Sequence, residues 1–254
     1  MGFEIDRKDL IEGLGKGLRV IEAFDDQNPR LTPSEAAARA GITRTAARRY
    51  LLSLVHFGYA ETDGKQFWLT ARVLRLANSF LTASRIARLV QPFIQHASMQ
   101  SGETVNVSVL DGHDVVYLAR SNSPRLVSIG FQTGARAPAH VVAPGVAILS
   151  TYTDAALDRW LAEHNFSAFT SRTVTDPKAF RDQVLTARQM DHWVAEQQLD
   201  VGLRGLAVVL RDLHGECRGA VSMTVPAQPH TPAQITERLL PLLREAANAM
   251  RPVL

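Results

Sequence analysis

The sequence has little cysteine and no long apolar run. Its single cysteine, Cys217, excludes an internal disulfide and any zinc site built from several cysteines, and it fits a reducing compartment. The first residues, MGFEIDRKDLIEG, carry charges where a signal peptide has an apolar core. No window approaches the ~18 consecutive apolar residues of a membrane span. These absences predict a cytoplasmic protein that makes no membrane contact and needs neither a metal ion nor a cofactor.

Sequence signatures of catalysis are also missing. The chain has no GxSxG or HExxH motif, its eight histidines are scattered, and no nucleophile is paired with a base. The stretch GLGKG, Gly13 to Gly17, resembles a glycine-rich phosphate loop. It lacks the Gly-Lys-Ser/Thr ending, however, and does not join a strand to a helix. The sequence therefore predicts a protein that is not an enzyme.

The chain does have enough apolar residues for more than one core. Its 254 residues are 46% hydrophobic, which suffices for one large or two modest domains. The formal net charge is only +3, but it is unevenly spread, because residues 36–60 hold four arginines and no acid. A local concentration of one sign attracts polyanions even when the net charge is small.

The first part of the chain predicts three helices. Residues 10–24 place apolar side chains at i, i+4 and i+7 along one helix face (Leu14, Leu18 and Ile21). Thr32 and Glu35 have the spacing of a capping box that starts a short second helix. Gly41 ends that helix, and Thr43 caps a third one.

A hairpin follows the third helix. Residues 59–69 read as two short strands, and Asp63-Gly64 between them favours a two-residue type I′ turn. Helix, helix, tight turn, helix and hairpin is the order of a winged helix-turn-helix. We therefore predict a DNA-binding domain over residues 1–70.

The third helix has two distinct sides. Its apolar residues at helical spacing predict a buried stripe (Ala47, Tyr50, Leu51 and Leu54). Polar residues near its start lie off that stripe (Thr43, Arg44, Thr45, Arg48 and Arg49). In a helix-turn-helix the second helix of the motif enters the major groove, where arginine reads guanine and other cations hold phosphates. We predict that these residues, with Lys65 at the hairpin tip, contact a double-stranded DNA operator.

The remainder of the chain predicts a helical linker and a second domain. Residues 71–83 continue an amphipathic helix without proline or glycine. Residues 84–254 mix helical patterns with alternating strands, including hairpins at Asp111-Gly112 and at Leu213-His214-Gly215, and a strand at 125–131. The predicted fold class is α+β, with an antiparallel sheet flanked by helices.

The second domain contains residues suited to holding a small acid. The stretch HVVAPGVAILS places small residues at a predicted helix start, where backbone N–H groups can bind a carboxylate. Ser222 and Thr224 alternate with apolar residues, so both hydroxyls share one strand face. Arg136 and Arg204 are possible partners for an acid. A solvent-facing strand and arginines that brace the backbone remain the alternatives.

Over nearly its full length the chain resembles IclR-family transcriptional regulators. The resemblance is carried by four stretches, EGLGKGLRVIEAF, GITRTAARRYLLSLVHFGYAETDGKQFWLT, SGETVNVSVLDGHDVVYLAR and VGLRGLAVVLRD. TRTAARRYLL and GLRGLAV are most similar to the branch that regulates aromatic-acid catabolism, the PcaR, PcaU and PobR group. The resemblance implies a homodimer or dimer of dimers on DNA. It also implies a GAF-like effector domain that binds a small organic acid.

The resemblance also implies where that acid binds. The candidate effector-binding residues are Ile129, His140, Ala143, Pro144, Gly145, Arg204, Gly205, Ser222 and Thr224. Two positions depart from the family pattern: Val146 stands where many relatives carry a lysine or arginine, and Gly205 where several carry cysteine. Both departures favour a roomier, more apolar pocket suited to an aromatic or dicarboxylic acid. An enzyme, or a ligand-binding module whose helix-turn-helix contacts protein, is the alternative.

Overall fold

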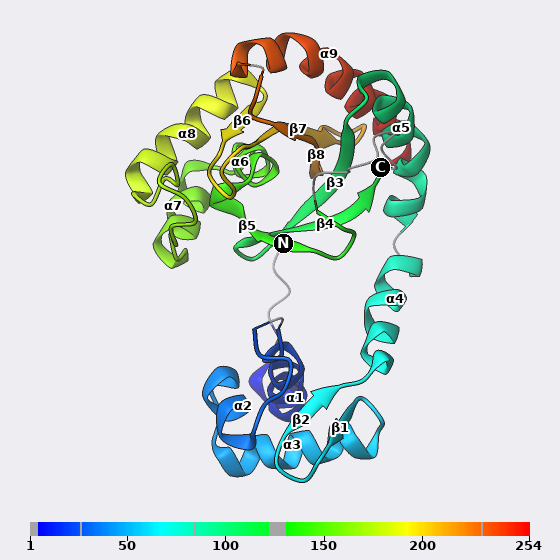
Figure 1. Cartoon of the computed structure of the whole chain (residues 1–254), viewed down its shortest axis with the longest axis vertical. Coiled ribbons are helices and arrows are strands. Elements are labelled where there is room, and N and C mark those ends of the chain that lie inside the picture. Colours follow the sequence, from blue (N-terminus) through cyan, green and yellow to red (C-terminus); the bar gives the residue numbers. More distant parts are fainter. Residues whose placement is uncertain (1–4, 26, 84, 122–130, 230) are drawn as a thin grey trace. The chain divides into compact units, whose positions relative to one another are not determined.

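The computed structural model describes residues 5–25, 27–83, 85–121, 131–229 and 231–254 (Figure 1). The chain forms two compact units, Met1–Phe80 and Leu81–Leu254. The division falls inside the helix that the sequence predicts as a linker. Among the described residues no helix combines the length and the apolar character that crossing a bilayer requires.

The first unit is a winged helix-turn-helix, as predicted. After a short 3-10 helix η1 (Arg7–Asp9) come α1 (Glu12–Glu22), α2 (Pro33–Ala40), α3 (Arg44–His56) and the antiparallel strands β1 (Ala60–Thr62) and β2 (Phe67–Leu69). The predicted caps are confirmed. Thr32 and Glu35 form a capping box, Gly41 ends α2 with φ 64°, and the Thr43 hydroxyl accepts a hydrogen bond from the Ala46 N–H at 3.2 Å.

The core of this unit differs from the prediction on α1. Ala47 and Leu51 of α3 are fully buried, with Tyr50 and Leu54 packed beside them, as the sequence indicates. On α1, by contrast, the buried residue is Val20, while Leu14 and Leu18 remain 65% and 45% exposed. Among the described residues of the first unit, none covers Leu14 and Leu18 on α1.

The glycines of α1 explain how this helix packs. A Cβ added to Gly13 would lie 3.4 Å from the Tyr50 hydroxyl, and one added to Gly17 would lie 3.6 Å from the Tyr50 ring. The stretch GLGKG thus lies within a helix whose small residues rest on an aromatic ring. Its likeness to a phosphate loop has no structural counterpart.

The turn of the wing is not the type I′ turn predicted from the sequence. Thr62 pairs with Phe67, so four residues connect the strands instead of two. Gly64 has φ 95°, but Asp63 does not have the positive φ that a type I′ turn needs. Its carboxylate instead accepts the N–H groups of Lys65 and Gln66, at 2.9 and 2.7 Å. A side chain that hydrogen-bonds two residues ahead competes with the tighter turn.

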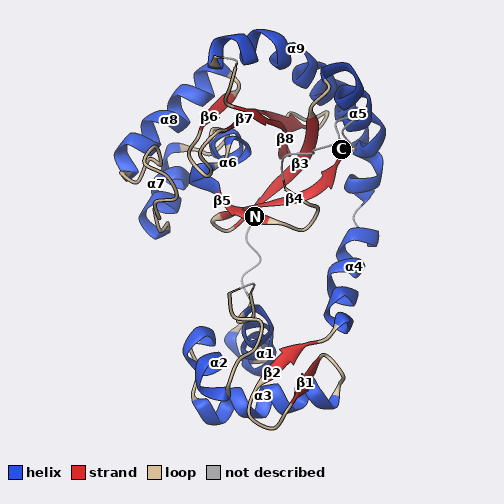
Figure 2. Cartoon of the chain, viewed as in Figure 1, coloured by secondary structure: helices blue, strands red, loops and turns tan. Residues whose placement is uncertain are grey.

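The second unit is built on one antiparallel sheet (Figure 2). Its strand order is β5-β4-β3-β8-β7-β6. The strands are β3 (Thr104–Asp111), β4 (Asp114–Arg120), β5 (Arg136–Pro138), β6 (Trp193–Glu196), β7 (Leu203–Arg211) and β8 (Cys217–Pro226). A 3-10 turn η2 (Ala71–Val73) is followed by α4 (Leu74–Ala83), which spans the division between the units. The other helices described in the second unit are α5 (Arg85–Ser101), α6 (Ala143–Leu149), α7 (Asp154–Glu163), α8 (Pro177–Met190) and α9 (Pro232–Met250). The predicted α+β class and its antiparallel sheet are confirmed.

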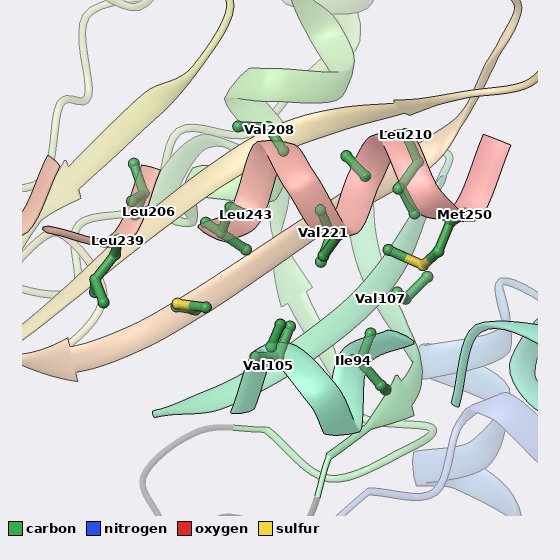
Figure 3. Packing of buried hydrophobic residues seen from close by; sticks show 14 of the residues in the cluster. Ile94, Val105, Val107, Leu206, Val208, Leu210, Val221, Leu239, Leu243 and Met250 are labelled. Carbon is green, nitrogen blue, oxygen red and sulfur yellow. The ribbon is translucent and has the colours of Figure 1, made fainter. Parts of the chain in front are cut away.

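One face of the sheet carries the larger core. Figure 3 shows Leu239, Leu243 and Met250 of α9 packed over the strands, with Ile94 of α5 alongside. The strands contribute alternate residues to this core (Val105, Val107, Leu206, Val208, Leu210 and Val221). This alternation is what the period of two in the sequence predicts.

The other face receives α6 and, behind it, α7 and α8. A β-bulge at Leu118 divides β4 between the two faces, because Ala119 pairs with Val107 while Tyr117 pairs with Ser108. Ala119 therefore joins the α5 and α9 core, and Tyr117 joins the core around α6. Loops and side chains over this face leave a cavity.

Sequence patterns missed both edge strands of the sheet. The strands predicted from the sequence include neither β5, at residues 136–138, nor β6, whose four residues have no alternating pattern. Short edge strands are held by one neighbour and need little propensity of their own. The strand predicted at 125–131 lies outside the described residues except for Phe131, which is not in a strand.

Candidate functional site

The arginines of the acid-free stretch separate into two kinds. Arg39 is a brace within the first unit: it pairs with Asp25 and donates to the Ala23 carbonyl at 2.6 Å. Hydrogen bonds from Asn28, and the nearby Arg39 guanidinium, hold the pKa of Asp25 below its usual value. Arg44, Arg48 and Arg49 are exposed on α3 and have no ion pair with the described residues.

The predicted polar side of α3 is thus open to a ligand. Thr45 is exposed beside the three free arginines, while Thr43 is exposed but uses its hydroxyl to cap the helix. Lys65 is exposed at the wing tip. Sequence reasoning missed Arg30, whose guanidinium carbon lies 4.1 Å from the centroid of the Trp68 ring on β2. This cation–π contact holds the positive charge of Arg30 beside the wing.

A cavity of about 390 Å³ lies in the second unit and is called the effector cavity below. That volume is within the range of sites for small molecules. Six of the nine predicted effector-binding residues line it: Ala143, Pro144, Arg204, Gly205, Ser222 and Thr224. Further lining residues are Tyr117, Phe131, Val141, Val142, Ala195, Gln198, Leu199, Asp200, Leu203 and Met223.

Three predicted residues are not among the described lining residues. Ile129 lies outside the described residues. His140 is buried just before α6 and Gly145 is buried within it, but neither lines the cavity. Arg136, the other predicted acid partner, is exposed on β5 and pairs with Asp111 and Asp114 at 2.9 and 3.2 Å.

One wall of the effector cavity is aromatic. The rings of Tyr117 and Phe131 stack with centroids 4.4 Å apart and an interplanar angle of 14°. Burial raises the pKa of the Tyr117 hydroxyl, which therefore stays protonated and can donate a hydrogen bond. The alternation of β4 alone would place Tyr117 and Ala119 on the same face, so the sequence held no direct signal for this wall.

Two buried polar side chains on the cavity's face of the sheet have no partners, although neither is among the lining residues of the cavity. Asn106 on β3 is opposite Ser222 on β8, so the two side chains share a sheet face. Asn106 is fully buried, and neither its amide oxygen nor its amide nitrogen has a hydrogen-bond partner within the described structure. Ser108 Oγ, two residues along, is in the same condition. Such groups cost stability unless a ligand or water completes them.

The charged side chains among the described lining residues are Arg204 and Asp200. Arg204 is the only cationic side chain among the described lining residues, and it pairs with Glu196 and donates to the Ala227 carbonyl at 2.7 Å. Burial alone would raise the pKa of Glu196, but the bonds from Arg204 and Gln197 outweigh it and lower that pKa. Glu196 stays charged, so Arg204 presents a neutralised guanidinium edge to the cavity.

The start of α6 offers fewer free N–H groups than the sequence predicts. Pro144 has none, and the Gly145 N–H donates to the Val142 carbonyl at 3.1 Å. A Cβ on Gly145 would lie 2.1 Å from the Ala139 carbonyl oxygen, and one on Gly205 would lie 3.2 Å from the Ala143 Cβ. Both glycines allow α6 to approach the backbone around it. The space beside Gly205 is thus taken up by Ala143 of α6, so the missing side chain does not by itself add volume to the cavity.

His140 belongs to a chain of three histidines behind α6. His140 Nε2 lies 3.0 Å from the Ser167 carbonyl, His140 Nδ1 lies 2.7 Å from His164 Nε2, and His164 Nδ1 lies 3.2 Å from His113 Nδ1. Burial, with His140 and His113 nearby, lowers the pKa of His164 to about 4. Because the carbonyl only accepts, His140 donates to Ser167, His164 donates to His140, and His113 donates to His164. Within the described residues no cluster of side chains is arranged to hold a metal ion.

Similarity to known proteins assigns the chain to a class of regulators. Residues 13–64 match the IclR helix-turn-helix domain, and residues 78–251 match the bacterial transcriptional regulator IclR C-terminal domain. The chain belongs to the IclR family of bacterial transcriptional regulators.

Similarity to individual proteins points to regulators of aromatic catabolism. The p-hydroxybenzoate hydroxylase transcriptional activator of Acinetobacter baylyi is 35% identical over 253 residues, covering 98% of this chain and 93% of its own. A putative transcriptional regulator of Rhodococcus is 34% identical with a TM-score of 0.75, covering 95% of this chain and 97% of its own. A double mutant of the inducer-binding domain of Acinetobacter PobR, solved with 3-hydroxybenzoic acid, is 27% identical with a TM-score of 0.63, covering 66% of this chain and 98% of its own.

The close approach at Gly145 gives a stability prediction. Gly145→Ala should lower the free energy of unfolding by about 3 kcal/mol, because the new methyl group meets a backbone carbonyl that cannot turn aside. Urea unfolding followed by circular dichroism measures the change. Gly15→Ala is the control, since its Cβ would have no neighbour closer than 4.0 Å and should stabilise α1. Equal stability of Gly145→Ala and the unmodified protein would contradict the packing assigned to α6.

Proposed function

We propose that this regulator changes its affinity for a DNA operator when a small aromatic carboxylate binds in the effector cavity. The observation that carries the proposal is the aromatic wall of Tyr117 and Phe131 in a cavity that Ser222 and Thr224 also line. A flat ring stacks on the wall. A polar substituent on that ring can form hydrogen bonds with the hydroxyls of Ser222 and Thr224.

The relatives support an aromatic acid over a short aliphatic one. One solved relative holds 3-hydroxybenzoic acid in its inducer-binding domain, and the curated relative named above activates a p-hydroxybenzoate hydroxylase gene. In this chain the lining is mostly apolar, and Val146 is buried in the core behind α6. Ser222, Thr224 and the edge of Arg204 are the groups available to the carboxylate.

For the DNA contact we propose the exposed side of α3. Arg44, Arg48 and Arg49 have no carboxylate to neutralise them in the described structure, and they start a helix that follows the helix-turn-helix turn. One of them reads a guanine in the major groove and the others hold phosphates. The wing supplies Lys65, with Arg30 as an added candidate.

We further propose that the protein acts as a homodimer. Leu14 and Leu18 form an apolar stripe on α1 that the described residues leave exposed, and Leu74 and Leu76 on α4 are 67% and 47% exposed. Apolar stripes of this kind mark protein contacts. A two-fold dimer places its two reading helices about one DNA turn apart, ~34 Å. The effector then acts by favouring one spacing of the pair over another.

Replacement of Arg48 tests the DNA contact. Arg48→Ala should weaken operator binding by about 1–3 kcal/mol, because it removes a base or phosphate contact, and should leave effector binding unchanged. Gel shifts at fixed salt on a duplex selected from a random pool measure the first effect, and calorimetry measures the second. Arg159→Ala, an exposed arginine on α7, is the matched control. Unaltered operator affinity for Arg48→Ala would remove Arg48 from the interface.

Calorimetry tests the class of effector. Among 4-hydroxybenzoate, protocatechuate, β-ketoadipate and pyruvate, the aromatic acids should bind tightest. Ser222→Ala should weaken their binding about tenfold, since a hydrogen bond to a charged group is lost. Ser171→Ala, an exposed serine, should change nothing. Tightest binding of pyruvate would overturn the aromatic assignment.

Sedimentation tests the dimer. Leu14→Ser combined with Leu18→Ser should shift the full chain toward monomer in analytical ultracentrifugation, because the apolar stripe of α1 is lost. Leu213→Ser is the control, since Leu213 is 67% exposed in the turn between β7 and β8. A double variant that sediments like the unmodified protein would place the dimer contact elsewhere.

A further inference from the structure

A second cavity, of about 200 Å³, lies at the edge of the sheet beyond the end of β6. We call it the arginine cavity. It is lined by Asp191, Val208, Val209, Arg211, Arg244, Ala247, Asn248 and Arg251. Four of these residues follow the spacing i, i+3, i+4 and i+7 along α9 and the turn after it, so they share one helix face.

The three arginines of this cavity lack ion-pair partners. None of them pairs with a carboxylate within the described residues, whereas Arg188, Arg218 and Arg238 of the same unit each do. Each makes one hydrogen bond, to a backbone carbonyl. The donors and acceptors are Arg211 to Gly215 at 3.1 Å, Arg244 to Met190 at 3.2 Å, and Arg251 to Asp212 at 3.4 Å.

The arrangement leaves donors and charge unused. Each guanidinium has five N–H donors, and Arg251 Nε is buried with no partner in the described structure. Asp191 is the one acidic side chain among the described lining residues. Three cations and one anion give the lining a formal charge of +2. A buried unpartnered donor beside uncompensated charge calls for a bound anion.

We propose that the arginine cavity binds a small dianionic oxyanion, a phosphate group or a dicarboxylate. Guanidinium groups bind such oxygens through paired, charge-assisted hydrogen bonds. A dianion balances the +2 of the lining, whereas a monocarboxylate leaves half of that charge uncompensated. The site differs from the effector cavity, with which it shares no described lining residue.

One strand runs from one cavity to the other. Leu203, Arg204 and Gly205 at the start of β7 line the effector cavity, and Val208, Val209 and Arg211 further along line the arginine cavity. The anion therefore binds to an element that also contacts the effector. The proposal itself does not depend on which effector the other cavity takes.

Calorimetric titration of the full chain tests the proposal. Inorganic phosphate and succinate are added separately at about pH 8, where phosphate is a dianion, with sodium chloride and acetate at matched ionic strength as controls. Saturable binding of phosphate, succinate or both is expected, and the preference identifies the source of the oxyanion. Binding of neither, or binding no stronger than that of acetate, overturns the proposal.

Variants that remove a positive or a negative charge from the lining test whether the dianion binds in the arginine cavity. Arg211→Gln and Arg244→Gln should each weaken dianion binding about tenfold. Asp191→Asn should strengthen it several-fold, because the one carboxylate in the lining is removed while asparagine still tolerates the φ of 55°. Arg244 is exposed, so its replacement leaves the fold intact. Arg159→Gln is the control and should bind as the unmodified protein does. Equal affinity across all variants would overturn the assignment.

Discussion

The close approach of α6 to the backbone around it is the constraint on which the effector domain depends. All seven residues of this helix are buried, and Gly145 touches the Ala139 carbonyl where any larger residue would collide. A short helix buried on every side has no polar face to place in water, so packing alone fixes its position. The residues just before and at its start, Val142 to Pro144, thereby become a rigid wall of the effector cavity.

The arginines of this protein differ in whether a carboxylate lies beside them. Arg39 and Arg204 pair with Asp25 and Glu196 and brace their domains. The arginines of α3 have no such partners and face outward. Sequence composition alone does not separate these two kinds, because a partner such as Asp25 comes from another element of the fold. Only the folded arrangement distinguishes an arginine that holds the protein together from one left available to an anion.

Sequence patterns predicted the helices of the first unit and the paired central strands of the second, because capping residues and alternation are local signals. Thr32 and Thr43 each cap a helix through their own side chains. The edge strands β5 and β6 were missed, since tertiary pairing holds them. In the effector cavity the small residues and hydroxyls were predictable by resemblance and alternation. Tyr117 was not, because its place in the cavity wall depends on how β4 pairs with β3.

The bulge at Leu118 shifts the register of β4 against β3 by one residue. If the ladder ran without interruption from Ala119, Leu118 would take the place opposite Ser108 and face the effector cavity. Tyr117 would then turn into the core under α5 and α9. A slip of one residue would thus exchange an aromatic, hydrogen-bonding wall for an aliphatic one while keeping the same number of strands. The register of β4 against β3 therefore determines the chemical character of the cavity wall as much as the identity of the residues does.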